Sequence, residues 1–289
     1  MAKPPRFTRP DSKTSRPDAP RPNRDVAPWA GRRPRSPSHP GSGTRLAKAT
    51  PELELIFGFH AVHEALRAGR RKLLRLHATA AAAEKLQGEI ALAKIPVNPV
   101  SGEDISASLA QDAVHQGVLL EARPIPMIDI SEISGKSGIV LVLDQVTDPH
   151  NVGAILRTAA AFGVDALVTT ERHSPEFSGV LAKAASGGLE HVAIVSVVNL
   201  SRALSELGDM GYLRIGLDSE GAQVLEQTPM RRPLALVLGA EGKGLRRLTR
   251  ERCDAIARLD MPGPVKSLNV SNACAIALNV VQSRALGVG

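Results

Sequence analysis

Three short segments in the C-terminal half carry the polar side chains and glycines that can support chemistry on a bound ligand. They are NVGAILRT at 151–158, LGAEGKGL at 238–245 and LDMPGPVKSLNVSN at 259–272. The third segment crowds Ser267, Asn269, Ser271 and Asn272 together. Ordinary helix capping accounts for one or two of these side chains, but not for all four. Backbone groups and polar side chains gathered in this way are typical of a small-molecule site.

Each segment follows an apolar run that predicts a buried strand. The runs are IVLVLDQV at 139–146, LALVLG at 234–239 and AIARL at 255–259. Ligands of open α/β sheets bind beyond the carboxyl ends of the strands, so we expect the three segments to converge on one site. The pattern SNACAIALNVVQSRAL at 271–286 predicts a mostly apolar, largely buried helix after the third segment.

Three polar side chains in the first two segments are candidates for a function, and two of them, Arg157 and Glu241, also allow a purely structural interpretation. Asn151 and Arg157 are six residues apart, and residues with this spacing do not lie on the same face of a helix. We therefore expect Asn151 in the loop before the helix, near its N-cap. Arg157 is out of place among Ala, Ile, Leu and Phe as a core residue, and it is either functional or exposed on the polar face. Glu241 lies in a glycine turn, where it is either a functional residue or a side chain that faces solvent.

The glycine-rich turn at 239–244 does not match the common phosphate-binding motifs. It lacks the Lys-Ser/Thr ending of a Walker loop, and it is not a GxGxxG fingerprint. Gly239, Gly242 and Gly244 instead leave backbone groups open to a ligand, although tight turns would also explain them. The neighbouring side chains of Leu238, Leu259, Met261 and Leu268 are apolar enough to wall an adenine. The histidines show no metal-ligand spacing, and no metal site is expected.

The chain divides into four parts. Strand and helix patterns alternate over 51–125, with a helix at 81–95, and predict a small α/β domain. A Pro-, Ser- and Gly-rich linker follows at 126–138, and a second α/β domain occupies 139–289. Residues 1–50 form a basic, Pro-rich tail that cannot bury enough apolar surface to fold, so it is expected to be disordered.

The tail supplies the entire basic excess of the protein, whose net charge is +7. Residues 1–50 hold 12 Lys and Arg against 3 Asp and Glu, whereas the other 239 residues hold 24 against 26. Such an arm attracts polyanions such as RNA, and a merely solubilising role is the alternative. The aromatic content of 2% makes base-stacking platforms improbable.

Two cysteines without ligand spacing, Cys253 and Cys274, indicate core thiols in a reduced, cytoplasmic protein. No apolar run is long enough for a membrane span, and the N-terminus lacks the apolar centre of a secretory signal. Ten prolines in the first 50 residues also disfavour an amphipathic mitochondrial presequence.

Through these motifs the chain resembles the SpoU/TrmH family of RNA ribose 2′-O-methyltransferases, which belongs to the SPOUT, or α/β-knot, superfamily. The resemblance rests on NxGxxxRT, LGxEGxGL and the SLNVS segment, and it covers about 139–286. The segment HSPEFSGVLAKAASGGLEHV also looks like the stretch between the family's first two motifs. IFGFHAVHEAL and HQGVLLEA resemble the substrate-binding domain of the bacterial RlmB-type subgroup, which methylates a guanosine in the peptidyl-transferase P loop of 23S rRNA.

The resemblance implies an α/β C-terminal domain with a deep trefoil knot, a smaller N-terminal RNA-binding domain, and a homodimer formed through the knot domain. It also implies S-adenosylmethionine as cofactor and 23S rRNA as partner. By motif, the cofactor would be held by Leu238, Gly239, Gly242, Leu259, Met261 and Leu268. The catalytic and RNA-contacting set would be Asn151, Arg157, Glu241, Ser267 and Asn269, with residues from both subunits.

The third motif departs from the family pattern Ile-Pro-Met-x-Gly, because this chain reads Leu259-Asp260-Met261-Pro262-Gly263. Proline fixes φ, so moving it from 260 to 262 is expected to reshape one wall of the cofactor pocket. The added carboxylate of Asp260 faces either solvent or the ligand's sulfonium.

Two further functions compete with methylation of the 23S rRNA guanosine. One is methylation of tRNA or of another rRNA site by an enzyme of the same family. The other is a non-catalytic RNA-binding or ribosome-assembly factor, which would not need the implied catalytic set.

Overall fold

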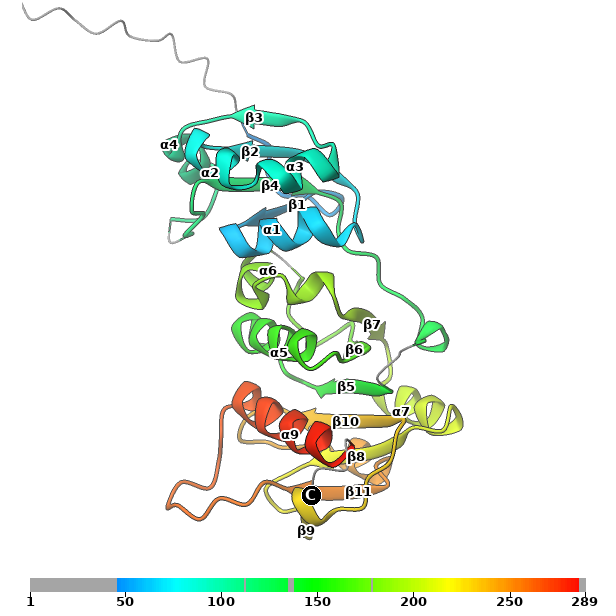
Figure 1. Cartoon of the computed structure of the whole chain (residues 1–289). Helices are drawn as coiled ribbons and strands as arrows, with labels where there is room; N and C mark the ends of the chain where they lie inside the picture. The colour runs from blue at the N-terminus through cyan, green and yellow to red at the C-terminus, as the bar shows by residue number, and fades with distance from the viewer. Residues whose placement is uncertain (1–45, 112, 135–137, 178, 286–289) are drawn as a thin grey trace, which may run out of the picture. The chain divides into compact units, whose positions relative to one another are not determined.

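The computed structural model describes residues 46–285 except 112, 135–137 and 178, and it contains two separate β-sheets (Figure 1). Most of the expected basic tail therefore lies outside the described residues. Among those that are described, no helix combines the length and the apolar character needed to cross a membrane.

The smaller sheet has four strands in the order β1-β4-β2-β3. Strand β4 runs antiparallel to β1 and β2, whereas β2 and β3 are parallel. The elements are β1 (Glu54–Phe57), α1 (Phe59–Ala68), β2 (Leu73–Ala78), α2 (Ala80–Lys85), α3 (Gln87–Ala93), β3 (Val97–Pro99), α4 (Gly102–Ser106) and β4 (Val118–Ala122). Strand β1 is buried throughout and β4 nearly so, because apolar side chains pack on both faces of this sheet: Ile56 and Leu120 lie in one core, and Leu55 and Leu119 lie in another with Ile105 of α4.

The single helix expected at 81–95 is wrong in one respect, because two helices stand there. Leu86 separates α2 from α3 with φ −103° and ψ 11°, which leaves the helical region. Its side chain is fully buried, and Gly88 follows in the first turn of α3. Burial of Leu86 and the low helix propensity of glycine together favour the break.

The larger sheet has seven strands in the order β7-β6-β5-β10-β8-β11-β9, and every neighbouring pair is parallel. The strands are β5 (Ile139–Asp144), β6 (Ala166–Thr170), β7 (Ala193–Val197), β8 (Leu213–Leu217), β9 (Gln223–Val224), β10 (Leu234–Gly239) and β11 (Ala255–Arg258). The helices are α5 (Pro149–Ala161), α6 (Gly179–Ala185), α7 (Leu200–Asp209), α8 (Arg247–Glu251) and α9 (Val270–Ala285). Short 3-10 turns lie at Ile130–Glu132, Gly188–Glu190 and Leu225–Gln227.

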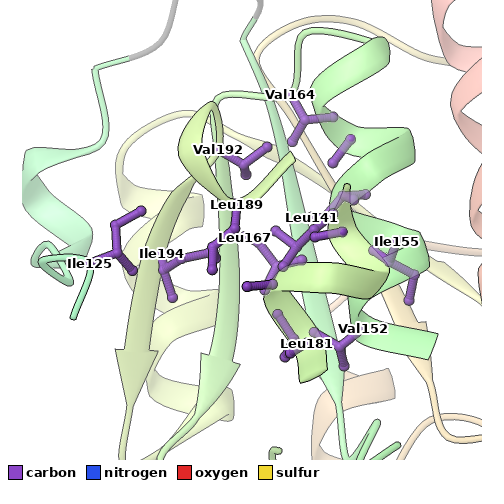
Figure 2. Close-up of a cluster of buried hydrophobic side chains, with 14 of the residues drawn as sticks. Ile125, Leu141, Val152, Ile155, Val164, Leu167, Leu181, Leu189, Val192 and Ile194 are labelled. Carbon is purple, nitrogen blue, oxygen red and sulfur yellow. The ribbon is translucent and has the colours of Figure 1, made fainter. Parts of the chain in front are cut away.

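Helices cover both faces of the larger sheet, which is why its central strands are apolar throughout. Leu141 of β5 packs with α5 and α6 on one face, where Val152, Ile155 and Leu181 meet Leu167 of the neighbouring strand (Figure 2). The alternate residues of β5 and β10 pack with α7 on the other face. Each apolar run therefore contributes to two cores.

The segment expected as a linker is partly packed. The backbone N–H of Ile128 donates to the carbonyl of Ile194 at 2.9 Å, next to strand β7. Ile130 and Ile133 are buried in the core beneath α7. A stretch rich in Pro, Ser and Gly thus also carries isoleucines that cover the edge of the sheet.

The chain returns across the sheet before its last helix. Strand β11 lies two places from β10, yet α9 packs against α5 and β10 (Figure 1). Residues 259–269 must therefore cross the carboxyl end of β8, the strand between β11 and β10. The family's knot requires such a return, and the knot itself stays a prediction.

Candidate active site

All three segments meet at the carboxyl ends of the parallel strands, where two cavities adjoin. The first, the apolar cavity, has a volume of about 200 Å³ and lies beyond β8, β10 and β11. The second, the polar cavity, has a volume of about 600 Å³ and lies beyond β5. Ala240, Glu241 and Val270 line both cavities, so the two are continuous.

The apolar cavity contains every residue assigned to the cofactor by motif. Four leucines contribute to its walls together with other apolar and some polar side chains, and the loop after β10 also lines it. The residues are Leu238, Gly239, Gly242, Leu259, Met261 and Leu268. Ser267 of the catalytic set also lines this cavity.

The polar cavity contains Asn151 and Glu241. The expectation that Asn151 precedes its helix is wrong, because Asn151 is the third residue of α5. Pro149 occupies the first turn, and the side chain of Asp148 caps the helix by accepting the N–H of His150 at 2.9 Å. Proline is suited to this position, since the N–H it lacks would have no partner there.

Asn269 joins the first and third segments. Its side-chain oxygen accepts the backbone N–H and the hydroxyl of Ser271, at 2.9 and 2.6 Å. That orientation leaves its NH₂ group to donate to the side-chain oxygen of Asn151 at 2.9 Å. This hydrogen bond joins the side-chain amides of two residues that are 118 positions apart in the sequence.

Arg157 does not join the other members of the catalytic set. It lies one and a half turns along α5 from Asn151, it is exposed, and it lines neither cavity. Its backbone packs close to Gly188, where an added Cβ would lie 2.8 Å from the Cα of Arg157. One chain therefore brings Asn151, Glu241, Ser267 and Asn269 together without Arg157.

The glycines of the loop after β10 serve two purposes. A Cβ on Gly239 would lie 2.3 Å from the backbone of Gly244, and one on Gly244 would lie 2.7 Å from the carboxylate of Asp218. Glycine is thus required at these two positions by the packing of the loop itself. Gly242, with φ 76°, has no atom within 4 Å of the added Cβ and borders the apolar cavity.

Two carboxylates outside the three motifs hold this loop from both sides. Asp144, at the end of β5, accepts the backbone N–H and the Nε of Arg246 at 3.0 and 2.6 Å. Asp218, after β8, accepts the backbone N–H of Leu245 and the Nη2 of Arg250, at 3.3 and 2.6 Å. Motif reasoning missed both residues, and the signal that could have found Asp144 is an acidic residue directly after an apolar run, as in IVLVLD.

The departure in the third motif places its carboxylate away from the cavities. Asp260 is exposed and lines neither of them, whereas Met261 lines the apolar cavity. The Nζ of Lys266 donates to the carbonyl of Met261 at 2.5 Å and closes the loop between them. Of the two orientations expected for Asp260, the structure has the one facing solvent.

With this geometry established, comparisons with known proteins identify the family. Residues 138–279 match the SpoU rRNA Methylase family, and residues 55–127 match the RNA 2′-O ribose methyltransferase substrate-binding family. The 23S rRNA (guanosine-2′-O-)-methyltransferase RlmB of Pseudomonas putida is 37% identical over 237 residues, which cover 78% of this chain and 95% of that protein. The chain belongs to the SpoU family of RNA ribose 2′-O-methyltransferases.

Solved structures of SpoU-type proteins share the fold. A putative RNA methyltransferase of the TrmH family from Porphyromonas gingivalis is 26% identical with a TM-score of 0.66, covering 81% of this chain and 91% of that one. An AdoMet-bound rRNA methyltransferase from Sinorhizobium meliloti has a TM-score of 0.69 at 22% identity, covering 81% and 88%. The predicted family, enzyme class and two-part α/β fold are confirmed.

Proposed function

We propose that this SpoU-family enzyme methylates the ribose 2′-hydroxyl of a guanosine in the peptidyl-transferase P loop of 23S rRNA, with S-adenosylmethionine as methyl donor. The hydrogen bond between Asn269 and Asn151 carries the proposal, because it joins the motif beside the apolar cavity to the motif beside the polar cavity. The similarity to RlmB over both domains supports the choice of substrate. Such a substrate places the reaction in the bacterial cytoplasm.

The apolar cavity fits the proposed cofactor in its chemistry. Leu238, Leu259 and Leu268 offer apolar walls for an adenine ring. The open space beside Gly242 lets a ligand approach the backbone of the loop. When bound, S-adenosylmethionine supplies an electrophilic methyl group on a sulfonium.

The polar cavity would receive the target nucleoside. Because Asn269 is fixed by Ser271, it holds the side chain of Asn151 as a rigid edge of the polar cavity. A rigid edge positions a hydroxyl for in-line attack, and positioning contributes up to about 7–11 kcal/mol in the best-oriented cases. Glu241 lines both cavities and is the carboxylate placed to orient either the nucleoside or an arginine.

Arg157 acts, in this proposal, from the second protomer of a homodimer formed through the knot domain. Its exposure on α5 supports this assignment, as does the fact that it lines neither cavity of its own chain. Arginine stays protonated, so its role is to hold the adjacent phosphate and to stabilise the alkoxide that develops, not to remove a proton.

Purified protein incubated with labelled cofactor and unmodified 23S rRNA fragments tests the substrate. We expect one 2′-O-methylguanosine in the P loop. Transfer to tRNA alone, or specific RNA binding without any transfer, would contradict the proposal and would favour one of the two competing functions.

Mixed dimers test the role of Arg157. The Arg157→Ala and Asn269→Ala variants should each lose methylation as homodimers, and Arg157→Ala should keep nearly normal cofactor binding by calorimetry. If Arg157 acts across the interface, randomly mixed protomers regain about a quarter of the activity, since half the dimers are mixed and each has one intact site. No recovery after subunit exchange would place Arg157 in its own chain's site.

A further inference from the structure

A third cavity, outside the proposed reaction centre, is lined by three arginines. This basic groove has a volume of about 630 Å³ and lies between the ends of β5 and β6 and the first turns of α7 and α8. Arg172, Arg246 and Arg247 supply its cations, and His173 adds an imidazole ring. None of the described residues that line the groove is acidic.

Arg246 is held in place before any ligand binds. The carboxylate of Asp144, whose side chain is fully buried, accepts both the Nε and the backbone N–H of Arg246. The carboxylate contacts the Nε, so the terminal NH₂ groups of the guanidinium have no partner among the described residues, and 46% of the side chain is exposed. Arginine fixed in this way loses little entropy when it binds an anion.

The other two arginines are less constrained. Among the described residues, Arg172 makes no side-chain hydrogen bond or ion pair. Arg247 pairs with Glu251 at the surface, an exposed i,i+4 contact that contributes little and exchanges readily for another anion. Both side chains are thus available to a ligand in the groove.

The groove continues the proposed reaction centre. Gln145 and His173 line both the basic groove and the polar cavity. The apolar side chains of Val198 and Leu248 also border the groove and are 82% and 52% exposed. A ligand that runs from the polar cavity into the groove would meet cations for phosphates and apolar surfaces for sugars or bases.

We propose that the basic groove binds the phosphodiester backbone of the RNA strand next to the nucleotide held in the polar cavity. This inference rests on the proposed function. Continuity with the polar cavity favours a chain that spans both spaces over a separate small anion. Phosphate contacts of this kind fix the register of a nucleic acid without reading its sequence.

Arg172→Ala is the first variant to test, because this exposed side chain has no partner to lose among the described residues. Arg246→Ala is less informative, since it would leave the buried carboxylate of Asp144 unpaired. Arg231→Ala is the control for position: Arg231 is also exposed, but it precedes β10 and so lies at the opposite end of the sheet, where its Nη1 donates to the carbonyl of Gly211 at 3.0 Å. Thermal unfolding should give the same midpoint for Arg172→Ala and the unmodified protein, and it should show that Arg231→Ala is folded after the loss of its exposed hydrogen bond to Gly211.

Binding of a P-loop RNA fragment is measured by fluorescence anisotropy over a range of salt concentrations. Arg172→Ala should bind about three- to tenfold more weakly, and its log–log salt slope should fall by about one. Arg172→Ala combined with Arg247→Ala should lower the slope further, whereas Arg231→Ala should not change it. In methyl-transfer assays, Arg172→Ala should raise KM for RNA and leave kcat and calorimetric cofactor binding nearly unchanged.

Suppose that Arg172→Ala binds RNA with unchanged affinity and salt slope while the unmodified protein methylates normally. The proposal that the basic groove binds RNA would then be wrong, and the proposed function would remain intact. The reverse result is distinguishable. If the unmodified protein methylates no 23S rRNA fragment but its RNA binding still depends on Arg172 and not on Arg231, the proposed function fails and the groove remains an RNA-binding surface.

Discussion

At the scale of single residues, the amide of Asn269 shows how a capping interaction sets the geometry of a site. Its oxygen is occupied by Ser271, so its NH₂ group can face only Asn151. The crowding of Ser and Asn in this segment exceeds what capping alone requires. The excess is explained by a side chain that caps α9 and reaches the first motif at the same time.

Cys274 is buried and Cys253 is partly buried, and we expect both thiols to react slowly in the folded protein. Burial raises the pKa of the Cys274 thiol to about 12, and that of Cys253 also to about 12, from an ordinary value of 9.0. At pH 8 the reactive thiolate is therefore about a thousandfold scarcer in the folded chain than in the unfolded one. We expect a thiol-specific colorimetric reagent to label neither cysteine within minutes under native conditions.

The same assay in denaturant provides the control, because both cysteines of the chain should then react. Rapid labelling of one thiol in the folded protein would show that its surroundings open far more readily than its burial indicates. A reactivity that rises only with unfolding would support the assignment of both as core thiols.

At the scale of elements, α5 and α6 approach each other closely at Gly153. A Cβ added there would lie 2.4 Å from the Cβ of Ala184 and 3.0 Å from the carbonyl oxygen of Leu181. Gly153→Ala should therefore lower the free energy of unfolding by about 1–3 kcal/mol, although alanine is the better helix former. Denaturant unfolding followed by circular dichroism measures the change.

Gly88→Ala is the control for this substitution. Gly88 is also helical, in α3, but no atom lies within 4 Å of its added Cβ. Its replacement should raise the free energy of unfolding by up to about 1 kcal/mol. Equal effects of the two substitutions would show that helix propensity, not contact between α5 and α6, decides the outcome at Gly153.

The elements differ in how well the sequence predicts them. The run LALVLG matches β10 residue for residue, because a central parallel strand is buried on both faces and has no polar interruption. The helical pattern at 81–95 does not reveal its break, since the burial of Leu86 depends on tertiary packing. Helix α5 begins earlier than expected because Asp148 caps it and Pro149 starts it, two residues before Asn151.

The parts of the site that local motifs define can be predicted from the sequence. The parts that depend on which distant strands lie side by side cannot. The apolar cavity contains all six residues assigned to it from the motifs. The contacts of Asp144 with Arg246 and of Asp218 with Leu245 join residues 102 and 27 positions apart, and they depend on the strand order. No local pattern reveals that order, nor does one indicate that Arg157 lies away from both cavities.

At the scale of the whole molecule, charge is divided between the N-terminal 50 residues, with a net charge of +9, and the remaining 239, with −2. The basic groove therefore concentrates cations locally on a part of the chain that has no cationic excess. A polyanion such as RNA should be attracted by the N-terminal residues and positioned by the groove, so the two contributions can be separated.

Deleting residues 1–50 should weaken RNA binding most at low salt and flatten its salt dependence, because the log–log slope falls by about 0.7 to 0.9 for each phosphate that the protein no longer neutralises. The methylated nucleotide should not change, since phosphate contacts carry no sequence information. The measurement is anisotropy from low to physiological salt, combined with mapping of the methyl group.

A full-length variant in which the 12 Lys and Arg of residues 1–50 are replaced by Gln keeps the length, removes the charge and should behave like the deletion. An unchanged slope in both proteins would assign the N-terminal residues to solubility alone, and a changed methylation site would give them a part in substrate choice.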